Sequence, residues 1–142
     1  MNHDPNCIFC MIVRGDAPSL KVYEDEDCLG FMDIMPQSEG HVLVIPKRHA
    51  AQIFDVSADE AAKLIRVTHE LAGAVRNAMQ PDGVMLAQLN GADAGQTVFH
   101  LHFHIVPRYA GQKLALHASK MGDTETLKTH CEKIRAALHD TA

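Results

Sequence analysis

The hydrophobic pattern is clearest between residues 57 and 80, where apolar positions recur at the three- and four-residue spacing of a helix. Ser57 followed by Glu60 forms a capping box, a common start of a helix. The sequence Pro-Asp-Gly at 81–83 stops the pattern. We therefore predict one long helix, with a stripe on one face made of Leu64, Thr68, Leu71, Val75 and Met79.

A second helical pattern covers residues 122–140, near the C-terminal end of the sequence. Asp123 is a candidate N-cap for this helix. Leu127, Ile134 and Leu138 recur on one side, which predicts an amphipathic helix with that side against the core.

The other apolar segments are short, and their composition is typical of strands. Residues 20–34 predict two strands joined by an acidic turn at 24–27, followed by a loop at 35–40. Further strands are predicted at 41–46 and 84–90. Few helices together with strands in hairpin-like pairs indicate an α+β domain built on an antiparallel sheet.

The segment 99–106 alternates histidine with apolar residues, and Pro107 is expected to close it. Because residues two apart share a face of a strand, the three histidines should point one way and the apolar residues between them into a core. The histidines are His100, His102 and His104, and the apolar residues are Leu101, Phe103 and Ile105.

Three interpretations of the histidines stay open from the pattern alone: half-buried residues in a histidine-rich chain, a zinc site, or a catalytic nucleophile. The preceding loop helps to choose between them. Asn90, Gln96 and Thr97 offer amide and hydroxyl groups, and its glycines let the backbone approach a ligand. Such donors suit phosphate oxygens. Together, loop and histidines favour a phosphorus centre beside a nucleophile.

Composition limits the classes of partner. The chain has 142 residues, enough for one domain, with 46% hydrophobic and 22% charged residues and a net charge of −5. An acidic surface has no general attraction for nucleic acid or anionic membranes. With no signal-like start, we expect a cytoplasmic protein with reduced cysteines. Cys28 and Cys131, in apolar patterns, are expected in the core.

The segment HLHFHIV resembles the signature of the histidine triad superfamily of nucleotide hydrolases and transferases. Residues 7–49 are similar to the N-terminal half of its histidine triad nucleotide-binding branch, and the similarity extends from about 7 to 111. It implies a single domain over 1–142, with a core at 7–111 and a helical extension at 112–142. It also implies an antiparallel sheet with a long helix, paired into a homodimer with one continuous sheet.

The resemblance further implies cleavage at the α-phosphate of purine nucleotides, with release of AMP, through a nucleotide bound covalently to His102 and without a catalytic metal. His41 matches the histidine whose backbone carbonyl orients that nucleophile, and Asp33 matches the acid that holds the ribose. The base pocket is expected from Ile8, Phe9, Phe31, Ile34 and Leu43, and the phosphate and leaving-group contacts from Asn90, Gln96, Thr97 and His104.

Other functions remain open: a dinucleoside polyphosphate hydrolase, a metal-dependent hydrolase, or a nucleotide-binding interaction module with incidental catalysis. The first differs from the AMP-releasing hydrolase in its leaving group, the second would lose activity with chelators, and the third would bind AMP with negligible turnover.

Cys7 and Cys10 form a C-x-x-C pair, which alone is a modest metal signal. Some bacterial relatives combine such a pair with two histidines that match His49 and His100, so the resemblance implies a structural Zn²⁺ site that is optional to the fold. The other histidines belong to no cluster of candidate residues and are expected on the surface; they are His3, His69, His117, His130 and His139.

Overall fold

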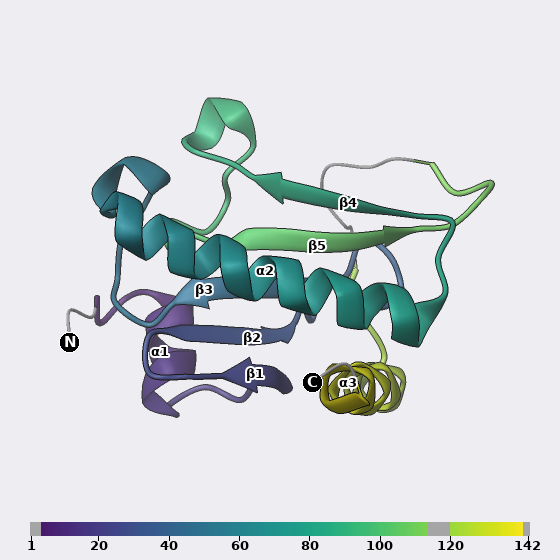
Figure 1. Ribbon diagram of the computed structural model, residues 1–142. Helices are drawn as coiled ribbons and strands as arrows, with labels where there is room; N and C mark the ends of the chain where they lie inside the picture. Colours follow the sequence, from purple (N-terminus) through teal and green to yellow (C-terminus); the bar gives the residue numbers. More distant parts are fainter. Residues whose placement is uncertain (1–3, 114–119, 141–142) are drawn as a thin grey trace.

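Five strands form one antiparallel sheet in the order β1-β2-β3-β5-β4 (Figure 1). The structure is a computed structural model and describes residues 4–113 and 120–140. The strands are β1 Lys21–Glu24, β2 Cys28–Met32, β3 Val42–Pro46, β4 Gly83–Gln88 and β5 Phe103–Arg108. The helices are α1 Ile8–Arg14, α2 Ala58–Met79 and α3 Thr124–Asp140, with short 3-10 turns η1 Ile53–Asp55 and η2 Ala92–Ala94. The predicted α+β class is confirmed.

Helix α2 begins and ends as its sequence predicts. The Ser57 hydroxyl accepts from the backbone N–H of Glu60, and the Glu60 carboxylate accepts from the backbone N–H of Ser57. The helix ends at Gln80, which adopts the left-handed conformation with φ 51°. Thr68 fills its place in the buried stripe because its hydroxyl donates to the Leu64 carbonyl.

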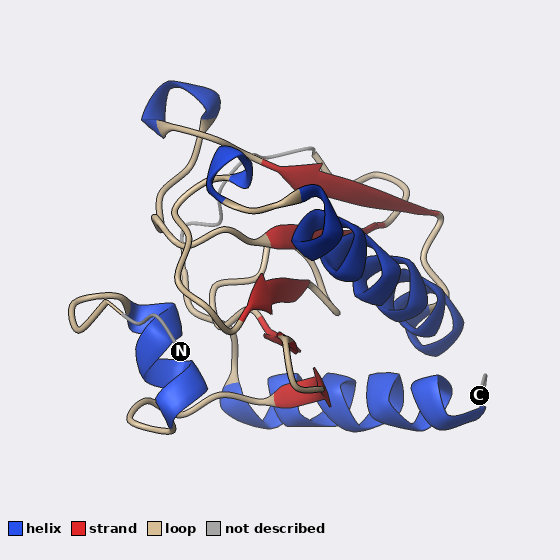
Figure 2. Ribbon diagram, turned by 60° about the vertical axis from the view of Figure 1, so that its left-hand side comes forward, coloured by secondary structure: helices blue, strands red, loops and turns tan. Residues whose placement is uncertain are grey.

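The two faces of the sheet carry two separate cores. On one face, Val42 and Val44 of β3 pack with α2. On the other face, Leu43 and Ile45 of the same strand pack beside α1. Figure 2 shows α1 on the opposite side of the sheet from α2. Strand β3 therefore carries apolar residues on both of its faces, and the face beside α1 can form the wall of a pocket.

Gly30 lets α2 lie close to the sheet. A Cβ at this position would lie 2.6 Å from the Cδ1 of Leu71, a fully buried residue of α2. A larger residue at position 30 would press against the buried Leu71 side chain, so the packing distance and not the backbone angles favours glycine here.

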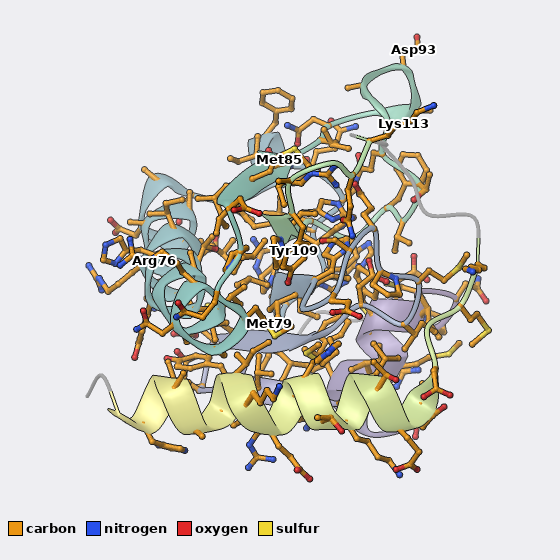
Figure 3. All side chains as sticks on the ribbon, turned by 90° about the vertical axis from the view of Figure 1, so that its right-hand side faces the viewer. Arg76, Met79, Met85, Asp93, Tyr109 and Lys113 are labelled. Carbon is orange, nitrogen blue, oxygen red and sulfur yellow. The ribbon has the colours of Figure 1, made fainter. Side chains whose placement is uncertain are left out.

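Helix α3 packs against α2 and β1. In Figure 3 it lies along one side of the molecule, with many nitrogen- and oxygen-tipped side chains on its outer face. The thiol of Cys131 donates to the Lys21 carbonyl at 3.4 Å, and Cys28 and Cys131 are both buried, as expected. The Asp123 carboxylate caps the helix through the Thr126 N–H.

The expectation for His130 was wrong: only 8% of it is exposed. Its position, three residues after Leu127 and four before Ile134, places it on the buried stripe of α3. His69 and His139 are exposed as expected, and His3 and His117 lie outside the described residues.

Two other features differ from the sequence prediction. Helix α1 was not predicted, because its seven residues are too few to show a helical period. The histidine segment becomes a strand only at Phe103, and it runs through Pro107 to Arg108. Proline is tolerated there because β3 pairs with β5 only at 103–105, so at 107 the strand has β4 alone as its partner.

Among residues 4–113 and 120–140, every helix is too short or too polar to span a lipid bilayer.

Candidate active site and metal centre

A cavity of about 580 Å³ lies on the α1 face of the sheet. Strand register builds its floor, because Phe31 of β2 pairs with Leu43 of β3, which in turn pairs with His104 of β5. Residues of α1 form one wall, and the loop after β2 forms the rim. Nine predicted site residues line this cavity: Ile8, Phe9, Phe31, Asp33, Ile34, Leu43, Thr97, His102 and His104.

His102 is buried at the edge of this cavity, with a ring whose protonation is set by the backbone. Its Nδ1 lies 2.7 Å from the carbonyl oxygen of His100. A carbonyl can only accept, so Nδ1 carries the proton and Nε2 keeps its lone pair. Burial lowers the pKa of the imidazole, although the bond to His100 raises it, so the neutral nucleophilic form is favoured.

The carbonyl that orients His102 therefore belongs to His100 and not to His41, which corrects the expectation from the resemblance. The His41 carbonyl instead accepts from the Asp33 N–H at 3.0 Å, and the imidazole ring of His41 faces His104.

A second chain of hydrogen bonds fixes His104 in the opposite tautomer. The backbone N–H of Gln37 donates to Nδ1 of His41 at 3.0 Å, so neutral His41 carries its proton on Nε2. That N–H reaches Nδ1 of His104 at 3.0 Å. Neutral His104 consequently carries its own proton on Nε2. Burial, then the neighbouring His104 and His102, lower the pKa of His41 to about 3, which keeps it neutral.

Asp33 lies beside His41 and His104. One carboxylate oxygen accepts from the Met35 N–H at 2.9 Å, and the other lies 3.5 Å from Nε2 of His41. Burial raises the pKa of Asp33 to about 6. Asp33, His41 and His104 are close enough to suggest a metal site. The proton on Nε2 of His41 opposes this, because metal binding there would place Nδ1–H against the Gln37 N–H.

The loop before the histidines has a more structural role than its sequence suggests. The Gln96 amide, 3% exposed, donates to the carbonyls of Ala51 and Val98 and accepts from the Gly91 N–H. Asn90 accepts from the Ile53 N–H at 2.9 Å. Neither side chain lines the cavity, whereas exposed Thr97 does.

The four predicted metal ligands meet beneath the other end of the histidine segment. The Cys7 sulfur lies 3.3 Å from Nδ1 of His100, and the Cys10 sulfur lies 3.4 Å from Nδ1 of His49 and 3.6 Å from that of His100. Zn–S and Zn–N bonds at a tetrahedral angle require sulfur and nitrogen about 3.6 Å apart. The donor set and its spacing therefore fit Zn²⁺.

Outer contacts orient these ligands. The Nε2–H of His100 donates to the Pro46 carbonyl at 2.8 Å, which leaves Nδ1 as the acceptor facing the sulfurs. Nε2 of His49 lies 4.0 Å from the Asp4 carboxylate. Carbonyl and carboxylate partners of this kind are usual behind metal-bound histidines.

Several residues that line the cavity were not predicted from the sequence. Ile12 lies one turn after Ile8 and Phe9 of α1, so recognition of that helix would have found it. The others come from loops whose approach only the tertiary structure brings about: Ala17, Pro18, Ser19, Met35, Gln37 and Val98, together with Met32 at the end of β2.

Comparison with known proteins agrees with this geometry. The sequence model of the HIT domain matches residues 14–111. The chain belongs to the HIT family. A HIT-like protein from Bartonella henselae has 44% identity and a TM-score of 0.87, covering 95% of this chain and 98% of that chain. The expected HIT fold is thus confirmed.

Two further relatives bear on chemistry. Adenylylsulfatase HINT3 of Arabidopsis thaliana is 36% identical, covering 89% of this chain and 67% of the relative. A zinc-bound histidine triad family protein from Mycobacterium smegmatis is 40% identical with a TM-score of 0.84, covering 96% of this chain and 95% of that chain. In this HIT chain, Cys7 and Cys10 precede the residues that match the HIT domain.

Proposed function

We propose that this HIT-family protein hydrolyses purine nucleotide conjugates at the α-phosphate, releasing AMP through a nucleotidyl-histidine intermediate on His102. The observation that carries the proposal is the pair of opposite tautomers in one cavity. His102 has a lone pair on Nε2, and His104 has a proton on Nε2. The likeness to an adenylylsulfatase supports an adenylyl substrate.

In the first step, Nε2 of His102 attacks the α-phosphorus and the bond to the leaving group breaks. The developing positive charge on His102 is stabilised by its Nδ1–H bond to the His100 carbonyl. The Nε2–H of His104, which is held in place by His41, donates a hydrogen bond to the leaving atom. That atom departs with the bonding electron pair and takes its proton from solvent. Thr97, at the cavity wall, can donate its hydroxyl to a phosphate oxygen.

In the second step, water attacks the nucleotidyl-histidine and the phosphorus–nitrogen bond breaks. The proton of the attacking water passes to solvent, and His102 leaves phosphorus as a neutral imidazole that keeps its Nδ1 proton. AMP leaves with the new oxygen. Neither step changes the number of protons on His104, and His102 returns to its starting form, so no metal is needed in the bond-making steps.

The apolar wall and Asp33 are assigned to the nucleoside. Ile8, Phe9, Phe31, Ile34 and Leu43 surround the base, and Asp33 holds the ribose hydroxyls from the rim. Asn90 and Gln96 keep the phosphate-side loop in shape through their bonds to neighbouring backbone, and do not contact phosphate through their side chains.

The direct test is His102→Ala, assayed with an adenosine phosphoramidate. We expect turnover to fall by at least about a thousandfold, equivalent to about 4 kcal/mol of barrier, with folding retained. His69→Ala, at an exposed position on α2, is the matched control and should be unaffected. Rapid acid-free quenching should trap adenylylated His102 in the wild type. Activity within tenfold of wild type in the variant would contradict the nucleophile assignment.

A substrate panel separates the alternatives. Faster turnover of the phosphoramidate or of adenylyl sulfate than of diadenosine polyphosphates supports the proposal, and the reverse order supports the polyphosphate hydrolase. Tight AMP binding with negligible turnover of all of them identifies a binding module. Complete, reversible loss of turnover on chelation, with AMP bound as before, identifies a metal-dependent hydrolase.

We also propose that Cys7, Cys10, His49 and His100 bind a structural Zn²⁺. The sulfur and nitrogen donors and their spacing support this ion, as does the zinc-bound relative. When bound, the ion supplies folding energy by joining the N-terminal segment to the sheet. Metal analysis of protein purified without chelators should find about one zinc per chain.

A homodimer is the proposed assembly. β4 is an edge strand, and no strand of residues 4–113 or 120–140 pairs with its outer side. Leu86 on β4 is 50% exposed, and Phe54 of η1 and Ile65 of α2 are exposed as well. Antiparallel pairing of two β4 strands would cover this edge. Light scattering should give twice the monomer mass, and Leu86→Lys should return the protein to monomer.

We propose that the whole chain, 1–142, acts as a single domain in the cytoplasm, with 7–111 as its core.

A further inference from the structure

We infer that the Cys7–Cys10–His49–His100 cluster is a positioning device for the active site, and that its metal sets both the nucleophile and the apolar wall of the nucleotide cavity. The inference rests on the proposed function of the cavity and deepens it. The ion takes no part in bond making. Its effect passes through two connections, one along His100 and one along α1.

His100 joins the cluster directly to the nucleophile. Its ring faces the sulfurs of Cys7 and Cys10, while its carbonyl accepts the Nδ1–H of His102 at 2.7 Å. Its second ring nitrogen donates to the Pro46 carbonyl. The residue is fully buried and its ring is held at both nitrogens, so the ring has little room to turn without a shift of the backbone. A shift of the ring toward or away from the sulfurs is therefore passed to the carbonyl that fixes the tautomer of His102.

Helix α1 joins the cluster to the cavity wall. Cys7 and Cys10 flank Ile8 and Phe9 in sequence, and both intervening residues line the cavity. The Phe9 ring packs edge-on against His102, with centroids 5.3 Å apart, and against His100 at 5.8 Å. Figure 2 shows α1 on the opposite side of the sheet from α2. The metal ligands therefore fix this wall together with the packing of Phe9 and Ile12 against the sheet.

The fourth ligand ties in the segment after β3. His49 precedes Ala50, whose carbonyl accepts from the Leu101 N–H at 2.7 Å, between His100 and His102. Thus the segments 7–10, 46–50 and 100–102 meet at one point. An ion there holds all three. Without the ion, the thiol–imidazole contacts among the four ligands are weak hydrogen bonds.

The expected effect of metal loss follows from the sensitivity of attack geometry. A displacement of about 1 Å at a nucleophile can cost about a hundredfold in rate. We expect metal-free, folded protein to lose roughly tenfold to a hundredfold in turnover, and to bind AMP more weakly because Ile8 and Phe9 move with α1. If the metal contributed only to stability, its loss would change neither the turnover nor the AMP affinity of the folded protein.

The experiment uses the full chain labelled with ¹⁵N-histidine, at one fixed pH and below the melting temperature. Zinc-loaded protein should show His102 as one tautomer, protonated on Nδ1. Chelated protein and His49→Ala should show averaged His102 nitrogen shifts and weaker AMP affinity. Leu138→Ala, in α3 and remote from the cluster, is the control for lost stability and should leave both readouts unchanged.

Cadmium-loaded protein provides the second measurement if the metal-free protein unfolds. This larger ion keeps the chain folded but changes the ligand spacing, so the His102 shifts and the AMP affinity should both move. Identical His102 shifts and AMP affinity for zinc, cadmium and any folded metal-free protein would overturn the inference. Failure of the proposed function looks different: zinc-loaded protein would bind AMP without turning over any adenylyl substrate, and the His102 shifts would still respond to the metal.

Discussion

Asp33→Asn should make this protein more stable at pH 8 while weakening nucleotide binding. The side chain of Asp33 is 19% exposed, and burial raises its pKa from 3.8 to about 6. That rise corresponds to about 3 kcal/mol by which folding disfavours the ionised carboxylate. Asparagine removes this cost because it cannot ionise, and its side-chain oxygen can still accept from the Met35 N–H.

The stability difference between Asp33→Asn and the wild type should depend on pH. Between pH 4 and pH 6 the folded protein holds a proton on Asp33 that the unfolded chain has lost, so the free energy of unfolding falls as pH rises. Above pH 6 Asp33 is ionised in the folded protein, which then bears the full cost of burying the carboxylate. The advantage of Asp33→Asn should therefore be near zero at pH 4 and reach up to about 3 kcal/mol at pH 8. His41, whose pKa is lowered to about 3, is common to both proteins and cancels in the difference.

Urea unfolding at pH 4, 6 and 8 measures this difference. AMP titration of the same samples should show a loss of about 1.5–3 kcal/mol for the variant, the usual range for a lost hydrogen bond to a charged group. A 2′,3′-dideoxy analogue should show little loss, because it lacks the hydroxyls assigned to Asp33. A variant no more stable than wild type at pH 8 would refute the burial reasoning, and equal losses for both nucleotides would refute the ribose assignment.

Three further predictions concern stability and are measured by thermal or urea unfolding. Gly30→Ala should cost about 1–3 kcal/mol, because its Cβ would lie 2.6 Å from the Cδ1 of the buried Leu71. A neutral effect would show that the Leu71 side chain yields without cost. Gly73→Ala, whose Cβ meets no described atom within 4 Å, should instead stabilise by about 0.5–1 kcal/mol. Ser57→Ala should cost about 1 kcal/mol by removing the cap of α2, and Ser57→Asp should restore it.

Local chemistry in the sequence was enough for the main elements. The capping box at Ser57 and the helical period up to Met79 defined α2, since both depend on neighbours within one or two turns. The alternation of His100, His102 and His104 pointed to the cavity and to the metal-ligand cluster, although only the last of them lies in a regular strand. The family resemblance supplied the distant ligands Cys7, Cys10 and His49, which the structure brings within reach of His100.

What tertiary structure decided was the direction in which each polar group points. Three aligned histidines acquire three different roles: His100 turns to the sulfurs, His102 is fixed by a carbonyl, and His104 accepts from His41. Gln96 and Asn90 look like ligand contacts in sequence but bind backbone far along the chain. A hydrogen bond depends on distance and angle to a partner. When that partner is tens of residues away, the strand register and loop packing that bring it close exist only in the folded protein.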